Sequence, residues 1–242
     1  MNLQSAVRLL RIFLHLSEGL GTCALVFPWA GAAYREARIR RWSRRLLAIC
    51  GVSLEHQGEA LEHALVVANH VSWLDIFVIN SLHPCRFVAK SEIRAWPVLG
   101  WLVAQAGTVF IARGNRRDLR HTFNGIVSSL ERGERVAFFP EGTTAAQGAL
   151  LPFHANLFEA AIDAGVMVQP YALEYRDAAG ALHASVDFTG DMTFALSTMA
   201  ILSGGAVRAR LVCLPALDAR GAHRRELAEA ARGAVAQTLA RY

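Results

Sequence analysis

The segment ALVVANHVSWLDIF (Ala64–Phe77) joins a short apolar run to a stretch with helical periodicity. The run Ala64–Ala68 predicts a buried strand, and the residues from about Ser72 to Leu82 predict a helix. Ser72 stands three residues before Asp75, a spacing that predicts a capping box with Ser72 as the N-cap. His70 is then expected in the turn between strand and helix.

The same alternation of strand and helix continues along the chain. Apolar or alternating runs predict strands at residues 86–89, 108–112, 135–139, 166–175, 181–188 and 207–213. Helical periodicity predicts helices at residues 96–107, 116–133, 154–165, 194–202 and 224–242. This order predicts an α/β fold with a mixed, largely parallel sheet flanked by helices.

Residues 1–50 are expected to form an N-terminal helical, membrane-anchoring and basic segment, ahead of an α/β domain at 51–242. A narrow polar stripe recurs at helical spacing in an otherwise apolar stretch: Gln4, Arg8, Arg11, His15 and Glu18. The next apolar run, Gly19–Tyr34, contains Pro28 and is shorter than the roughly 20 residues of a spanning helix. We expect a helical anchor lying on the membrane. A single span, a soluble helix pair and a signal cleaved near Ala30–Ala32 are the alternatives.

Charge and cysteine content limit the classes of partner and the cellular compartment that we expect for this chain. The chain has 242 residues, a formal net charge of +5 and 53% hydrophobic residues, enough for one large core and consistent with an anionic partner. Six arginines follow the apolar segment and suit an anionic cytoplasmic leaflet, at roughly 1 kcal/mol each near such a surface: Arg35, Arg38, Arg40, Arg41, Arg44 and Arg45. The four cysteines show no C-x-x-C pair or zinc-type spacing, so we expect buried thiols in a reducing compartment and no metal site.

His70 and Asp75 are the candidate catalytic pair. On a continuous helix two residues five positions apart differ by about 140° and do not face each other. With His70 in the turn, its ring can fold back toward the Asp75 carboxylate. The carboxylate would hold one imidazole nitrogen as N–H and leave the other as a general base. No G-x-S-x-G elbow supplies a nucleophile, so the substrate is expected to bring a hydroxyl. The alternative is that Asp75 only caps the helix.

Further polar residues stand at the ends of predicted strands, where open α/β sheets bind ligands. They are Lys90, which is the only lysine, Arg113, and the turn Glu141, Gly142 and Thr143. Arginine and lysine bind phosphate, and a glycine-containing turn lets backbone N–H groups approach an anion. Together with the His70–Asp75 pair, these residues indicate a base beside an anion site.

Four ordered blocks resemble the glycerolipid acyltransferases typified by bacterial 1-acyl-glycerol-3-phosphate acyltransferases: NHVSWLD, VFIAR, FPEGTT and VMVQPYAL. The resemblance implies that His70 deprotonates an acceptor hydroxyl for attack on an acyl thioester and that Asp75 orients His70. Lys90 and Arg113 would bind the acceptor phosphate, and Glu141, Gly142 and Thr143 would shape the pocket. It also implies acyl-CoA or acyl-carrier protein as co-substrate, with no other cofactor, no metal and no nucleic acid.

The function implied is O-acyl transfer to a lysophospholipid, 1-acyl-sn-glycerol-3-phosphate above all, at the cytoplasmic face of the bacterial inner membrane. The chain departs from the family at Thr144, where many members carry arginine, and at Phe153–Asn156, where F-K-x-G is usual. The same chemistry on lyso-ornithine lipid is therefore an alternative, as is a non-catalytic lipid-binding protein. A hydrolase or metal enzyme lacks support, because the sequence contains no H-x-x-x-H or H-E-x-x-H motif.

Overall fold

The fold is built on one twisted sheet. The computed structural model describes residues 3–96, 98–111 and 116–241, and within them seven strands follow the order β1-β7-β6-β2-β5-β3-β4. Their bounds are β1 Val52–Gln57, β2 Leu65–Ala68, β3 Arg86–Lys90, β4 Val109–Ile111, β5 Val136–Phe138, β6 Val168–Arg176 and β7 Val207–Cys213. Neighbouring strands are parallel except β6 and β7. The carboxyl ends of β2 to β6 therefore point the same way, and β1 and β7 run in the opposite direction.

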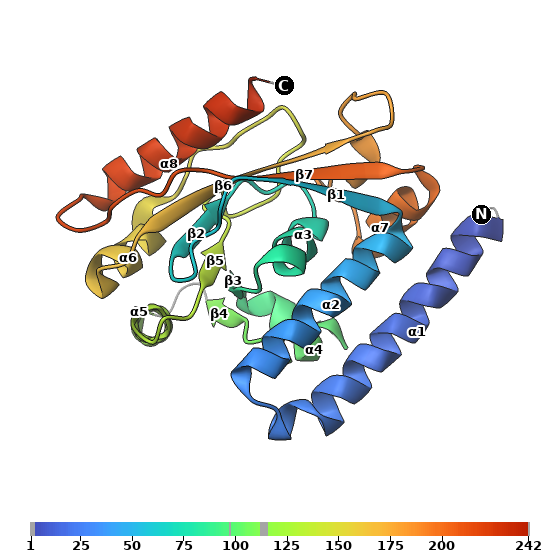
Figure 1. Cartoon of the computed structure of the whole chain (residues 1–242), viewed down its shortest axis with the longest axis horizontal. Helices are drawn as coiled ribbons and strands as arrows, with labels where there is room; N and C mark the ends of the chain where they lie inside the picture. The colour runs from blue at the N-terminus through green and yellow to red at the C-terminus, as the bar shows by residue number, and fades with distance from the viewer. Residues whose placement is uncertain (1–2, 97, 112–115, 242) are drawn as a thin grey trace.

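Helices cover both faces of this sheet (Figure 1). Their bounds are α1 Leu3–Leu25, α2 Ala32–Cys50, α3 Leu74–Leu82, α4 Leu99–Gln105, α5 Arg116–Glu131, α6 Glu159–Ala164, α7 Phe194–Ser203 and α8 Arg224–Leu239. Side chains of β2 alternate between the two layers: Val66 and Ala68 pack with α2, α3 and α7, while Leu65 and Val67 pack with α5, α6 and α8. Because β2 is buried on both faces, its sequence is apolar throughout. The predicted mixed, largely parallel sheet between helices is confirmed.

Residues 181–188 do not form the predicted strand. They contain a short 3-10 helix, Ala184–Val186, and a single bridge from Leu182 to Arg176. The reason is tertiary, because the Gln147 side chain accepts from the Tyr175 N–H and donates to the His183 carbonyl. The Gln147 amide therefore occupies hydrogen-bonding positions that a strand paired with β6 would need.

Other boundaries also differ from the sequence prediction. The expected helix 96–107 is shortened to α4 and follows a 3-10 turn, Ser91–Ala95. The expected helix 154–165 begins with a 3-10 turn, Ala155–Phe158, before α6. The edge strand β1 was not identified from the sequence, since only Val52 on it is buried.

The N-terminal helices form a hairpin beside the sheet (Figure 1). A 3-10 turn, Phe27–Trp29, with Pro28 in its first turn, separates α1 from α2. The His15 ring stacks on Trp42 with 4.4 Å between ring centroids. On α1 the buried side chains include polar ones, whereas large apolar side chains are exposed: Leu3, Val7, Leu9, Leu10, Phe13, Leu14 and Leu25. This is the reverse of a soluble helix and is typical of a helix that contacts lipid.

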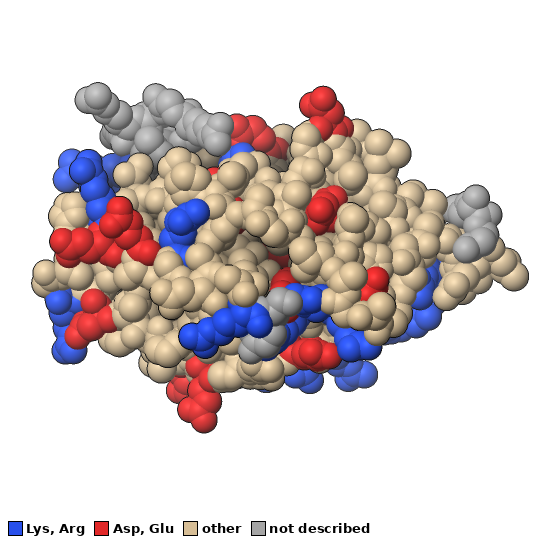
Figure 2. All heavy atoms as spheres, turned by 90° about the horizontal axis from the view of Figure 1, so that it is seen from above, with Lys and Arg blue, Asp and Glu red and all other residues tan. Residues whose placement is uncertain are grey.

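Four of the six arginines bond within the hairpin or to α3, which the sequence did not predict. Arg35 donates to the Phe27 and Ala30 carbonyls, and Arg44 to that of Ser81. Arg38 and Arg45 each form an ion pair with Glu18. Basic and acidic side chains are also interspersed on the face shown in Figure 2. The four arginines named above hold the helices together. The number of arginines alone therefore does not measure attraction to a membrane.

One described helical stretch is long and apolar enough to cross a membrane, judged by length and composition. It covers Leu3–Trp29, 27 residues, with a mean hydropathy of 1.4 in its most apolar window, of which 22% is buried. The stretch lies near the N-terminus, where signal sequences share these properties.

Candidate active site

His70 and Asp75 meet at the carboxyl end of β2. His70 lies in the turn before α3, and its Nδ1–H donates to Asp75 Oδ2 at 2.7 Å. Asp75 is completely buried, whereas the His70 side chain is 18% exposed. The carboxylate therefore selects the tautomer with the proton on Nδ1. Nε2, which has no hydrogen-bond partner among the described residues, is left with a lone pair.

Asp75 is held by backbone groups of the same turn, in a way that differs from the predicted capping box. The helix begins at Leu74 with Trp73 as N-cap and no side-chain cap, and the Ser72 hydroxyl is buried without a partner among the described residues. Asp75 Oδ2 instead accepts from the N–H groups of Val71 at 2.7 Å and Ser72 at 2.9 Å. The prediction of Ser72 as N-cap is wrong, because the turn that positions His70 delays the start of the helix.

Tyr175 completes the environment of Asp75. Its hydroxyl, on β6, donates to Asp75 Oδ1 at 2.5 Å. Burial, together with the charge of Asp75, raises the pKa of Tyr175 well above its usual value, so the hydroxyl stays protonated and donates. Sequence reasoning missed this residue, because 100 positions separate it from Asp75. The only available signal was its place at the end of a predicted strand.

Replacing Tyr175 by phenylalanine is expected to lower the free energy of unfolding by about 1.5–3 kcal/mol, the usual range for a hydrogen bond to a charged group. Denaturant unfolding would measure it. Tyr34→Phe, at an exposed position, serves as control and is expected to change stability by less than about 0.5 kcal/mol. Equal stability of Tyr175→Phe and wild type would contradict a stabilising hydroxyl–carboxylate bond.

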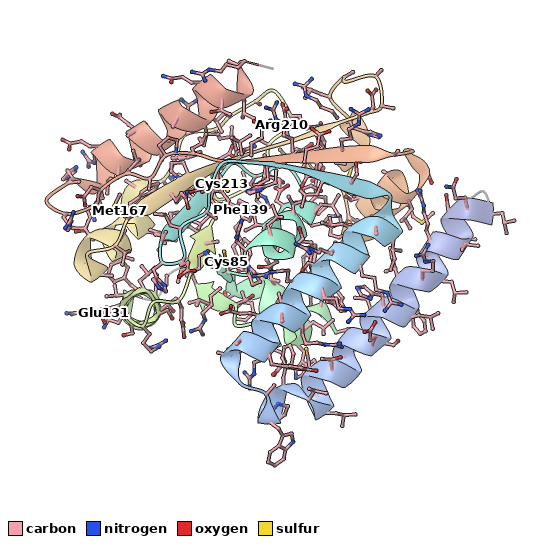
Figure 3. All side chains as sticks on the ribbon, in the orientation of Figure 1. Cys85, Glu131, Phe139, Met167, Arg210 and Cys213 are labelled. Carbon is pink, nitrogen blue, oxygen red and sulfur yellow. The ribbon has the colours of Figure 1, made fainter. Side chains whose placement is uncertain are left out.

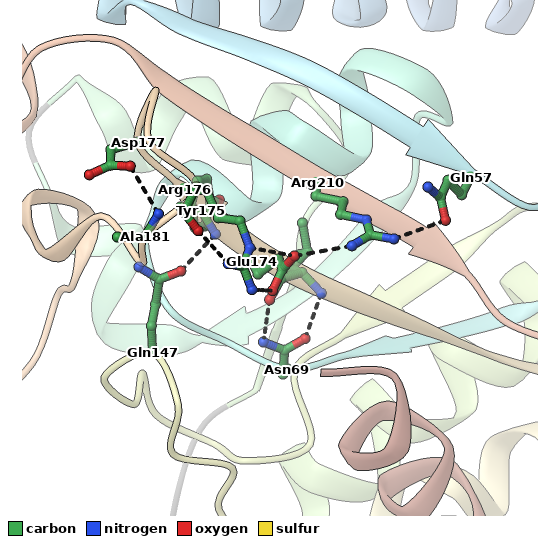
Figure 4. A network of polar contacts seen from close by, with 11 residues as sticks. Gln57, Asn69, Gln147, Glu174, Tyr175, Arg176, Asp177, Ala181 and Arg210 are labelled. Atoms are coloured by element: carbon green, nitrogen blue, oxygen red, sulfur yellow. Dashed lines mark hydrogen bonds and ion pairs between the residues drawn. The ribbon is translucent and has the colours of Figure 1, made fainter. Parts of the chain in front are cut away.

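Two neighbours fix the position of His70. The side chain of Asn69 bonds both the carbonyl and the N–H of Leu173 on β6, at 2.9 and 2.8 Å, which extends the ladder beyond β2 (Figure 4). The His70 ring stacks on Phe139, with 3.9 Å between centroids and 6° between planes. Phe139 directly follows β5 and is half-buried; it is labelled in Figure 3. These contacts restrict the imidazole to one orientation.

Glu141 joins the turn after β5 to the turn that carries His70. One carboxylate oxygen accepts from the His70 N–H at 2.7 Å, and the other accepts from the Leu151 N–H at 2.8 Å. Burial raises the pKa of Glu141, while these two N–H donors act in the opposite direction. Both oxygens face backbone groups, so Glu141 shapes the turn and does not present a free carboxylate to a substrate.

The remaining predicted residues occupy the same edge of the sheet. Gly142 has φ +70°, a conformation that favours glycine, and the His154 ring lies against it. Thr143 is exposed beside it. Lys90 is exposed at the end of β3 and is paired in register with Ile111 of β4. Arg113 lies outside the described residues. The structure therefore brings His70, Asp75 and Glu141 into direct contact, and places Lys90 along the same edge without a hydrogen bond to them.

This arrangement suits general-base catalysis. A buried carboxylate fixes one ring nitrogen, the other remains available, and the ring is immobilised by stacking. No serine or cysteine side chain among the described residues bonds to His70. The site can therefore activate a hydroxyl group that a substrate provides.

Comparison with known proteins shows which family the chain resembles. The acyltransferase family model matches residues 52–174, which include every block around His70. The 1-acyl-sn-glycerol-3-phosphate acyltransferase of Neisseria meningitidis serogroup B is 46% identical over 149 residues, 60% of this chain and 58% of that protein. The lyso-ornithine lipid O-acyltransferase of Pseudomonas aeruginosa is 36% identical over 244 residues, 98% of this chain and 94% of that protein.

A solved structure shares the fold. The 1-acyl-sn-glycerophosphate acyltransferase PlsC of Thermotoga maritima superposes with a TM-score of 0.72, at 20% identity, over 99% of this chain and 96% of that chain. The chain belongs to the acyltransferase family, as the sequence blocks predicted. The match spans 58% of the length of the Neisseria meningitidis protein and 54% of the length of the 1-acyl-sn-glycerol-3-phosphate acyltransferase of Neisseria gonorrhoeae, less than two thirds in each case.

Proposed function

We propose that this protein is a membrane-associated O-acyltransferase that moves a fatty acyl group from an acyl thioester to the free hydroxyl of a lysophospholipid. The preferred acceptor is 1-acyl-sn-glycerol-3-phosphate, and the product is phosphatidic acid. The observation that carries the proposal is the His70 ring, held through Nδ1 by buried Asp75 at 2.7 Å with its other nitrogen unpaired among the described residues.

The reaction needs no acyl-enzyme. His70 Nε2 accepts the proton of the acceptor hydroxyl while the hydroxyl oxygen forms a bond to the thioester carbonyl carbon. The carbon–sulfur bond then breaks, and the departing thiolate takes the proton from His70. Asp75 stabilises the imidazolium that exists between these steps and keeps Nδ1 protonated. The thioester is acyl-CoA or acyl-carrier protein, and no further cofactor takes part.

The acceptor phosphate is assigned to the carboxyl edge of β3 to β5. Lys90 supplies an exposed positive charge there. Arg113, which follows β4 in the sequence and lies outside the described residues, is proposed as a second phosphate ligand. Glu141 and Gly142 hold the turn beside them, with Thr143 exposed on it. The phosphate would thus anchor the lysolipid while its hydroxyl reaches His70.

Membrane association is proposed through α1. Its exposed apolar side chains would enter the interfacial region, lying on the bilayer or crossing it once. The location proposed is the bacterial inner membrane with the site on its cytoplasmic face, where acyl thioesters are available. The division into an anchoring segment at 1–50 and a catalytic domain at 51–242 belongs to the same proposal.

Lyso-ornithine lipid is the second candidate acceptor. The Pseudomonas aeruginosa relative, which aligns over 98% of this chain, is named for that lipid. The resemblance leads us to expect arginine at position 144 in a protein that binds a phosphate acceptor. Thr144 stands there instead, and its hydroxyl donates to the Phe188 carbonyl. An anion-binding group is therefore missing at this position, which favours an acceptor without a terminal phosphate.

A panel of acceptors tests the proposal. Purified protein is incubated with one labelled acyl thioester and, separately, with 1-acyl-sn-glycerol-3-phosphate, lyso-ornithine lipid or no acceptor. We expect acceptor-dependent release of thiol and labelled phosphatidic acid, with the phosphate acceptor fastest. Lys90→Gln is expected to raise the KM for 1-acyl-sn-glycerol-3-phosphate about tenfold and to leave the KM for lyso-ornithine lipid unchanged. Faster acylation of lyso-ornithine lipid would establish the second candidate, and binding without thiol release would contradict both.

A further inference from the structure

Three metal-ligating side chains meet near the carboxyl ends of β1 and β7 and the end of α3. His56 lies near the end of β1, Cys213 ends β7, and His83 is the C-cap of α3. One ligand atom from each lies within 4.8 Å of the other two, and Cys213 Sγ is 3.5 Å from His56 Nε2. The polar groups thus converge from three segments that are distant in the sequence.

Two buried polar atoms here have no hydrogen-bond partner among the described residues: His83 Nε2 and the Tyr171 hydroxyl. Tyr171 is completely buried and is the register partner of Cys213 across β6 and β7, so the two side chains share a face. Figure 3 shows Cys213 at this place in the sheet. Unpaired buried polar atoms are rare in folded proteins and point to a missing partner.

We infer that His56, His83 and Cys213 form a binding site for Zn²⁺. Zinc binds imidazole nitrogen and thiolate sulfur in tetrahedral geometry, and ligand atoms clustered this closely need only small adjustments to reach it. Solvent supplies the fourth position, since His56 is exposed. The Tyr171 hydroxyl donates to the metal-bound thiolate, as groups behind metal ligands commonly do.

The ion would tie the ends of β1 and β7 to the end of α3. That helix carries Asp75 in its first turn, so the site would stabilise the element that positions the base without touching the substrate. This role is independent of the proposed acyl transfer.

Metal titration tests the inference. Protein stripped with a chelator is titrated with Co²⁺ and then with Zn²⁺, and metal content is measured. We expect about one equivalent per chain, tetrahedral Co²⁺ absorption and a thiolate-to-cobalt band. His56→Ala and Cys213→Ser are expected to weaken Zn²⁺ binding at least about tenfold, and Cys213→Ser to abolish the thiolate band.

Matched variants keep the test specific. His63→Ala replaces another exposed histidine, and Cys23→Ser replaces a thiol 8% exposed, against 6% for Cys213. Both are expected to bind like wild type. Because His56 is exposed, His56→Ala decides the question if Cys213→Ser does not fold. Absence of a thiolate–cobalt band in wild type, or Zn²⁺ affinity unchanged in His56→Ala, would overturn the inference.

Discussion

Replacing His70 by alanine is expected to reduce the rate of thiol release from an acyl thioester, in the presence of a lysolipid acceptor, by about 10²- to 10⁴-fold. This is the usual contribution of a positioned general base. The His70 ring is the only group that links the Asp75 carboxylate to the exposed side of the site among the described residues. Without the His70 ring, the acceptor hydroxyl has to attack the thioester while it still carries its proton.

Two controls separate a base from a structural residue. Vesicle binding of His70→Ala is expected to remain close to wild type, because α1 is unaltered. Unfolding is expected to remain cooperative, with a loss of about 1.5–3 kcal/mol in the free energy of unfolding for the hydrogen bond to Asp75. Added imidazole is expected to restore part of the activity by filling the space beside Phe139. Near-normal turnover of the variant would exclude the mechanism.

Replacing Asp75 by asparagine is expected to lower kcat about 10²-fold or more with little change in KM. The amide can still accept from the Val71 and Ser72 N–H groups through one oxygen. It is neutral, however, and no longer stabilises an imidazolium on His70 or enforces the productive tautomer. The measurement is steady-state kinetics with acceptor and thioester varied separately.

Stability should fall as well. The Tyr175 hydroxyl loses a charged acceptor, which costs about 1.5–3 kcal/mol in the free energy of unfolding. Asp163→Asn, on the exposed side of α6, provides a control with the same chemical change and an expected effect below about 0.5 kcal/mol. An unchanged kcat in Asp75→Asn, with only stability reduced, would assign Asp75 a capping role alone.

The most local features were the ones that could be predicted. The strand at 65–68, the helix that ends at Leu82 and the meeting of His70 with Asp75 all depend on apolar periodicity and on a spacing of five residues. The prediction of a strand at 181–188 failed because alternation alone does not show that Gln147 occupies the neighbouring position on β6. The prediction of an N-cap at Ser72 failed for a similar reason, since the Asp75 carboxylate and not the Ser72 hydroxyl bonds the backbone of that turn.

The sequence by itself determined the α/β order, the turn that bears His70 and the helix that bears Asp75, because these follow from interactions between near neighbours in the chain. Only the tertiary structure decided which distant groups complete them. Glu141 reaches His70 across 71 positions, Tyr175 reaches Asp75 across 100, and Cys213 approaches His56 across 157. Such contacts depend on strand order and register, which bring the ends of strands distant in the sequence close together.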